Sequence, residues 1–206
     1  IHTETVIQTT EGEYLAKDPD GVSYLLRKWC EGRECNTASW DEILRSADIL
    51  ASLHEAMNQM EHPLTEVLDT DAGRLLRTYE KHTRELRTVR NYTRGRKNKS
   101  EFEKEFLGLY PKFEEQASEI LESLREQEGI CHGDFNQHNI VFRSEYAAVI
   151  SFDNICYDVQ IGDLARFMRK ILEKNNWNMG LGMEMIRAYS DKKAMSPYET
   201  KQLYLR

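Results

Sequence analysis

The spacing of apolar residues changes near residue 37 of the chain. Upstream, short apolar runs bounded by turn residues predict two strands, at residues 3–10 and 22–26. Between them, the Asp-Pro-Asp-Gly segment at 18–21 predicts a turn, because proline fixes φ and glycine accepts positive φ. Downstream, apolar residues recur with the 3.6-residue period of a helix. The pattern therefore predicts a small piece of sheet followed by a mostly helical region.

Four helical stretches are predicted first in this region. One follows Thr37 or Ser39, either of which can cap its amino terminus. The next runs from about Asp71 into an arginine-rich segment, the third ends near Gly129, and the fourth begins around residues 162–163. The third carries an aromatic stripe that we expect to pack into the core, formed by Phe102, Phe106 and Phe113.

Short strands are predicted between the third and fourth helical stretches. One leads into residues 131–140, one covers residues 140–142, and one covers residues 147–152. A last helix is expected at residues 198–205. The order is thus a fragment of sheet, helices, a loop with short hairpins, and more helix.

Composition excludes several classes of protein. The 206 residues are 40% hydrophobic and 31% charged, which is too apolar for a disordered chain. The net charge of −7 argues against a generally nucleic-acid-binding surface. No apolar stretch approaches the roughly 20 residues of a membrane span, so no membrane association is expected. The one strongly basic stretch, residues 84–99, is expected to be solvated, with contact to an anionic partner as the alternative.

The four cysteines show no C-x-x-C pair and no metal-ligand spacing. Cys131 and Cys156 lie next to apolar segments and are expected to be buried as small hydrophobic residues. A reducing cytosol is the expected compartment. His54 is expected to be a structural histidine, whereas His138 is compatible with either lining a site or facing solvent.

The chemistry of the chain is concentrated in residues 131–140, which read Cys-His-Gly-Asp-Phe-Asn-Gln-His-Asn-Ile. His132-x-Asp134 followed by four residues and Asn139 is the spacing of a kinase catalytic loop. Phosphoryl transfer needs a carboxylate to hold and deprotonate the attacking hydroxyl, and an amide oxygen to hold the metal on the phosphates. Asp134 and Asn139 have the groups for these two roles. With the order of elements, this loop predicts the carboxy-terminal lobe of a kinase-like protein.

The amino-acid sequence of this loop, together with Gly-Asp at residues 162–163, resembles the aminoglycoside phosphotransferase and choline kinase branch of the kinase-like fold. The segments at 132–139, 150–153 and 163–177 are similar to the CotS family of bacterial spore coat proteins. The segment at 29–34 resembles the hinge of that family. The resemblance extends over roughly residues 10–189.

The resemblance implies an α+β, protein kinase-like fold, represented mainly by its helical carboxy-terminal lobe with a remnant of the amino-terminal sheet. The implied division is a partial sheet at 1–28, a hinge at 29–36 and a helical lobe with catalytic-loop hairpins at 37–206. Nucleotide would lie between the lobes, with adenine at the hinge, formed by Lys28, Trp29 and Cys30.

The resemblance also implies the roles of single residues. Asp134 would be the catalytic base, and Asn139 would be a metal ligand. Asp163 would brace the catalytic loop as a structural carboxylate. His132 is expected to be a buried hydrogen-bonding brace rather than an acid or base.

Two departures from the phosphotransferase pattern argue against activity. The aspartate expected to hold magnesium after the loop is replaced by Ser151. Asp153 would lie about 6–7 Å away along an extended strand, so it can serve as a metal ligand only if the backbone leaves the extended form. The glycine loop, the strand lysine and its glutamate partner are expected upstream of residue 1, since Lys17 sits at the predicted turn.

Three hypotheses follow. The leading one is a spore coat protein of kinase-like fold with degenerate or divergent catalysis. It would work through binding and assembly with other coat proteins, first in the mother-cell cytoplasm and then in the coat. The second is an ATP- and Mg²⁺-dependent phosphotransferase acting on a hydroxyl of a small molecule or sugar, with Asp134 as base and with Asn139 and Asp153 on the metal. The third is a pseudokinase that binds nucleotide.

Overall fold

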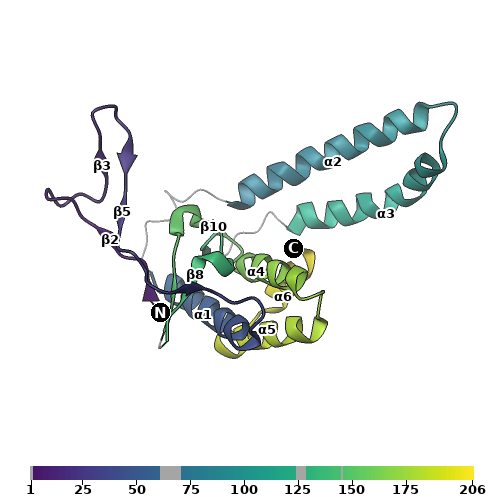
Figure 1. Cartoon of the computed structure of the whole chain (residues 1–206). Coiled ribbons are helices and arrows are strands. Elements are labelled where there is room, and N and C mark those ends of the chain that lie inside the picture. Colours follow the sequence, from purple (N-terminus) through teal and green to yellow (C-terminus); the bar gives the residue numbers. More distant parts are fainter. Residues whose placement is uncertain (1, 61–70, 124–128, 145) are drawn as a thin grey trace.

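The structure, a computed structural model, describes residues 2–60, 71–123, 129–144 and 146–206. Figure 1 shows three parts: a body of helices and short strands, a narrow ribbon of strands at one side, and a long helical hairpin at the other. Each part follows from a different sequence pattern.

The ribbon contains β2 (Val6–Ile7), β3 (Ala16–Lys17), β4 (Ser23–Tyr24) and β5 (Leu26–Arg27). Strand β2 pairs antiparallel with β5, and β3 pairs antiparallel with β4 (Figure 1). The predicted turn is confirmed, because Asp18 Oδ1 accepts a hydrogen bond from Val22 N at 2.9 Å and Gly21 has φ of 81°. The two long strands predicted here are wrong in extent, since the first is divided between β1 (His2–Thr3) and β2 and the second between β4 and β5.

A four-stranded sheet joins strands near the amino terminus to the two strands that follow the catalytic loop. It contains β1 (His2–Thr3), β9 (Ala147–Val149), β8 (Ile140–Phe142) and β6 (Arg33–Glu34), in that order. Strand β1 runs parallel to β9, and the other pairs are antiparallel. The predicted division at residue 28 stays a prediction, but the structure attaches β1 to the strands that follow the catalytic loop.

The body is built on four helices: α1 (Trp40–Asn58), α4 (Ile161–Lys174), α5 (Met179–Lys192) and α6 (Pro197–Leu205). Ser39 caps α1 by accepting a hydrogen bond from Glu42 N. Helix α1 packs along α5, and its predicted apolar face is buried. The core combines side chains from three of these helices with the strands, among them Ile43, Leu50, Phe135, Ile140, Val149, Leu164, Phe167, Ile171, Leu181 and Met185.

The helical hairpin consists of α2 (Asp71–Gly95) and α3 (Glu101–Ser123), and it extends away from the body (Figure 1). The expectation that the aromatic stripe of α3 packs into the core is wrong, because Phe102 is 76% exposed and Phe113 is 51% exposed. Helix α3 instead buries Tyr110, whose ring lies 4.7 Å from the Arg90 guanidinium carbon. Helix α3 is described as far as Ser123, and Gly129, near which its end is predicted, begins the next strand; residues 124–128 between them lie outside the described residues.

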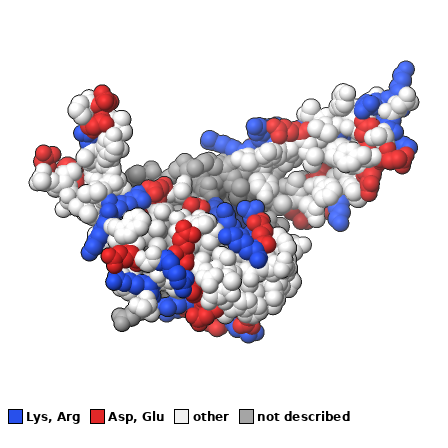
Figure 2. All heavy atoms as spheres, viewed as in Figure 1, with Lys and Arg blue, Asp and Glu red and all other residues white. Residues whose placement is uncertain are grey.

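The basic stretch at 84–99 covers the second half of α2 and the turn that follows. Arg87 pairs with Glu114 at 3.3 Å, and Arg96 pairs with Glu103 at 2.5 Å. Figure 2 shows acidic side chains interspersed with the basic ones over the hairpin. These pairs favour the solvated interpretation of the stretch over an anion-binding surface. Among the described helices, none is long and apolar enough to cross a membrane.

Candidate active site

The catalytic loop follows β7 (Gly129–Cys131), which pairs antiparallel with β10 (Cys156–Asp158). Cys131 and Cys156 face each other in this pair and are buried, as predicted, and all four cysteines are free. The first turn of α4 lies beneath the loop. The Asp163 carboxylate accepts hydrogen bonds from His132 N at 2.7 Å and Gly133 N at 3.1 Å. It therefore fixes the backbone where the loop begins.

Asp163 belongs to a buried chain of polar groups. His54 Nε2 donates to Asp163 Oδ2 at 3.2 Å, and His54 Nδ1 lies 2.8 Å from the Tyr189 hydroxyl. Burial raises the pKa of Tyr189, so its hydroxyl stays protonated and donates to His54. Burial also acts to raise the pKa of Asp163, but the hydrogen bond with His54 and nearby Arg166 outweigh it, and the pKa lies below the usual value. The brace under the loop is thus an ionised carboxylate.

His132 is fully buried and uses both ring nitrogens in the backbone. Its Nδ1 accepts from Asp134 N at 3.2 Å, so its Nε2 carries the proton that is donated to Ile150 O at 3.0 Å. The ring ties the loop to the segment after β9. This position fits the predicted role of a brace, since neither nitrogen points to solvent.

Gly133 is the one position of the loop where only glycine fits. Its φ is 79°, and a Cβ placed there would lie 1.8 Å from the carbonyl oxygen of Asn154. The loop and the turn at residues 152–154 are therefore in backbone contact. This contact brings the two halves of the candidate site together.

Asp134 and Asn139 lie side by side, as the loop spacing predicts. The Asn139 amide nitrogen donates to Asp134 O at 2.8 Å and to Asp134 Oδ2 at 3.1 Å. Asn136 Nδ2 donates to the other carboxylate oxygen of Asp134 at 3.0 Å. The Asp134 side chain is thus held in one orientation, half-buried, by two amides.

Asn136 is a residue of the site that the sequence analysis missed. Its Oδ1 accepts from His138 N at 2.9 Å, which caps the short helix η2 (Gln137–Asn139). Its Nδ2 group is then turned toward Asp134. An asparagine two residues after the aspartate, at the start of a turn, was the available signal.

The segment after β9 differs from the predicted strand at 147–152. Strand β9 ends at Val149, Ser151 has φ 66° and ψ 57°, and residues Phe152–Asn154 form the short helix η3. The backbone thus leaves the extended form, which is the condition for Asp153 to act as a metal ligand. The Asp153 carboxylate, however, is bound by both terminal nitrogens of Arg27, with Nη1 to Oδ2 at 2.9 Å.

The residues present fit a divalent metal only in part. Because the Asn139 amide nitrogen faces Asp134, its oxygen is turned the other way and is suited to a metal. Within the described ranges, no group of three or more His, Cys, Asp or Glu side chains gathers that could hold a metal. Magnesium sites with one or two carboxylates keep several waters. Asn139 and Asp153 would be the protein ligands, once Asp153 is released from Arg27.

A cavity of about 500 Å³ lies between the predicted hinge and the loop. Lys28, Trp29 and Cys30 line one side, and His138, Val141 and Ile150 line another. His138 thus lines the site although it is 59% exposed, and its Nδ1 contacts Glu34 Oε2 at 2.6 Å. The lining includes His138 and Ile150, the residues that precede Asn139 and Ser151 in the chain, so the cavity reaches the catalytic loop.

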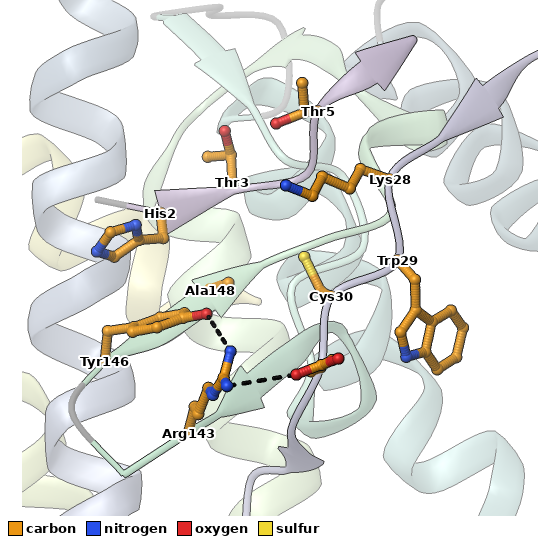
Figure 3. A pocket seen from close by; sticks show the side chains of 10 residues that line it. His2, Thr3, Thr5, Lys28, Trp29, Cys30, Arg143, Tyr146 and Ala148 are labelled. Carbon is orange, nitrogen blue, oxygen red and sulfur yellow. Dashed lines mark hydrogen bonds and ion pairs between the residues drawn. The ribbon is translucent and has the colours of Figure 1, made fainter.

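A second cavity, of about 380 Å³, shares the hinge residues but faces the turn between β8 and β9. Figure 3 shows Lys28 extending toward Thr3, and the Trp29 ring pointing away from Tyr146. Arg143 contacts Tyr146 and Glu31 there, at 3.4 and 3.3 Å. The second cavity contains none of the loop residues at 132–139.

The fold and the spacing of the loop together are those of the protein kinase-like class. The sequence profile of the phosphotransferase enzyme family (APH) matches residues 6–200, and the chain belongs to this family. The α+β fold predicted from the sequence is confirmed. A search of curated proteins gave no significant match.

Solved structures of the same fold are distant in sequence. An aminoglycoside phosphotransferase from Alicyclobacillus acidocaldarius has a TM-score of 0.67 and 16% identity, covering 100% of this chain and 63% of its own. Amicoumacin kinase, in complex with AMP-PNP, Ca²⁺ and Ami, has a TM-score of 0.65 and 14% identity, covering 100% of this chain and 62% of its own. A choline/ethanolamine kinase family protein from Mesorhizobium loti has a TM-score of 0.58 and 13% identity, covering 98% of this chain and 59% of its own. The chain spans about three fifths of these relatives.

Proposed function

We propose that the protein is an ATP-dependent phosphotransferase that acts on a hydroxyl group of a small molecule or sugar. The observation that carries the proposal is the Asp134 carboxylate, held by the amides of Asn136 and Asn139 on a loop braced by Asp163. Two amides and a buried carboxylate dedicated to one half-buried aspartate favour a residue that must be oriented, as a catalytic base must.

The proposed step uses the Asp134 carboxylate as the base. The substrate hydroxyl donates its proton to Asp134 while its oxygen forms a bond to the γ-phosphorus of ATP. The bond from that phosphorus to the bridging oxygen breaks, and ADP leaves. When bound, a divalent metal would neutralise charge on the phosphates, and Asn139 and Asp153 would hold it. Adenine would lie in the larger cavity, against Lys28, Trp29 and Cys30.

Known relatives support the nucleotide and the metal by analogy of fold. The amicoumacin kinase structure contains AMP-PNP and Ca²⁺, and a spectinomycin phosphotransferase structure, with a TM-score of 0.58 and 13% identity, contains ADP. A shared fold does not assign a substrate.

A second candidate is the CotS-like function, in which a kinase-like fold with degenerate catalysis serves in spore coat assembly. The observation that favours it is the metal position, where Ser151 supplies no carboxylate and Asp153 is engaged by Arg27. Its partners would be other coat proteins, and it would lie in the mother-cell cytoplasm before entering the coat. A nucleotide-binding pseudokinase is the intermediate case.

Thermal unfolding with nucleotide separates these functions, using the protein as its gene encodes it. A ligand at one hundred times its Kd stabilises the folded state by about 2.7 kcal/mol, which is a readily measured rise in Tm. We expect such a rise with millimolar ATP and Mg²⁺, accompanied by phosphate transfer to a hydroxyl acceptor. A rise without transfer from a broad panel of acceptors indicates the pseudokinase. No rise at all contradicts both and leaves the coat-protein function.

A further inference from the structure

Asp153, a candidate metal ligand, is already bound by a positively charged side chain of the protein. Arg27, on β5 of the ribbon, places both terminal nitrogens on the two carboxylate oxygens of Asp153. A bidentate pair of this kind is the most directional ion pair that side chains form. The Arg27 side chain is only 27% exposed, although Asp153 is 57% exposed. Asp153 therefore already has a cation where a metal ligand should be free.

Glu4 contacts both Arg27 and the backbone of the residue before Asp153. Its Oε1 accepts a hydrogen bond from Phe152 N at 3.1 Å and lies 3.4 Å from Arg27 Nη1. The Glu4 side chain is 11% exposed. Glu4, between β1 and β2, thus contacts both the guanidinium and the backbone of η3, the turn that carries Asp153.

The charges explain what the guanidinium does at this position. Glu4 and Asp153 are two carboxylates that contact the same nitrogen of Arg27, so they lie close together. With Arg27 between them, the cluster has a net charge of −1. Without it, the same two carboxylates would face each other uncompensated, which is the environment that attracts a divalent cation.

We propose that Arg27 is an internal cation that competes with the divalent metal for Asp153. A metal then binds to Asp153 only when the guanidinium is displaced, so Arg27 sets the metal affinity of the site. The use of this competition rests on the proposed phosphotransferase function, but the competition itself is tested by metal binding, without any phosphate transfer.

The experiment is titration of the protein with Mn²⁺, in the absence of nucleotide, followed by the decrease of the free-ion electron paramagnetic resonance signal. Replacing Arg27→Gln is expected to tighten Mn²⁺ binding about tenfold. This is the effect of removing a unit positive charge about 5 Å from a divalent ion at the dielectric constant of water. Arg187→Gln is the matched control, because it removes the same charge from an exposed pair with Glu184 on α5, and its Kd should equal that of the wild type.

A double variant identifies the ligand. Arg27→Gln combined with Asp153→Asn should lose the gain and bind Mn²⁺ no better than the wild type. If Arg27→Gln does not fold, Arg27→Lys replaces it, since lysine keeps the charge but cannot form the bidentate contact. We then expect Mn²⁺ binding tighter than in the wild type, by less than tenfold.

The proposal is overturned if the folded Arg27 variant binds Mn²⁺ no more tightly than the wild type, or if Arg187→Gln gives an equal gain. It is also overturned if the double variant keeps the gain. A gain at Arg27 in a protein that transfers no phosphate leaves this inference standing and removes only the catalytic function.

Discussion

Replacing Asp163→Ala should destabilise the protein more than any surface change. The carboxylate accepts three hydrogen bonds, from His132 N, Gly133 N and His54 Nε2, and is 2% exposed. Hydrogen bonds to a charged group contribute about 1.5–3 kcal/mol each, and a buried N–H left without a partner costs about 1–3 kcal/mol. Part of this is offset, because the variant no longer buries a charge. We expect a loss of about 3–5 kcal/mol.

Urea unfolding followed by circular dichroism measures this loss. Asp191→Ala, an exposed substitution on α5, should stay within about 0.5 kcal/mol of the wild type. A double-mutant cycle with His54→Ala should give a coupling energy of about 0.5–3 kcal/mol, because the two side chains are in contact. A loss below about 1 kcal/mol for Asp163→Ala, with an unchanged denaturant slope, would refute the bracing role.

The Asp163 carboxylate also predicts how the stability of the protein depends on pH. Its pKa in the folded protein lies below the ordinary value, so the folded state binds fewer protons than the unfolded state near pH 4. Its contribution to stability is therefore present above the unfolded pKa of about 3.9 and is lost as the pH falls through the folded pKa. The free energy of unfolding of the wild type should fall more steeply below about pH 4 than that of Asp163→Asn.

Other substitutions test the loop contact and the packing. Gly133→Ala should cost at least about 2–3 kcal/mol by urea unfolding, from its positive φ and the clash with the Asn154 carbonyl, whereas Gly95→Ala, with open space around it, should be neutral or stabilising. Equal effects at the two glycines would contradict the close approach. Phe135→Ala should cost about 3–5 kcal/mol, since the ring is fully buried, and Phe102→Ala less than about 0.5 kcal/mol. A large loss at Phe102 would show that α3 is covered.

The catalytic loop was predictable because its chemistry is local. The spacing from His132 to Asn139 fixes a short turn, and the structure brings Asp134 and Asn139 within 3.1 Å. Helix α1 and its cap at Ser39 were also predictable, since caps and the 3.6-residue period act over a few residues.

Long-range partners were not predictable from one sequence. Arg27 and Asp153 are 126 residues apart, and the sequence of neither segment indicates that the two side chains are in contact. The conformation of Ser151 likewise depends on tertiary contacts of its neighbours, since Phe152 N is bound by Glu4. The prediction that the aromatic stripe of α3 packs into the core was wrong for a related reason. Periodicity shows that a helix has an apolar side, but not what covers it.

The most direct test of the central claim is the rate of phosphate transfer from ATP in Asp134→Asn, compared with the wild type and with Asp191→Asn. A positioned base contributes about 10²–10⁴-fold, so we predict a loss of this size for Asp134→Asn, with the rise in Tm on ATP binding unchanged. Asp191→Asn should transfer phosphate at the wild-type rate. Equal transfer rates for Asp134→Asn and the wild type would contradict the assignment of this loop as the catalytic centre.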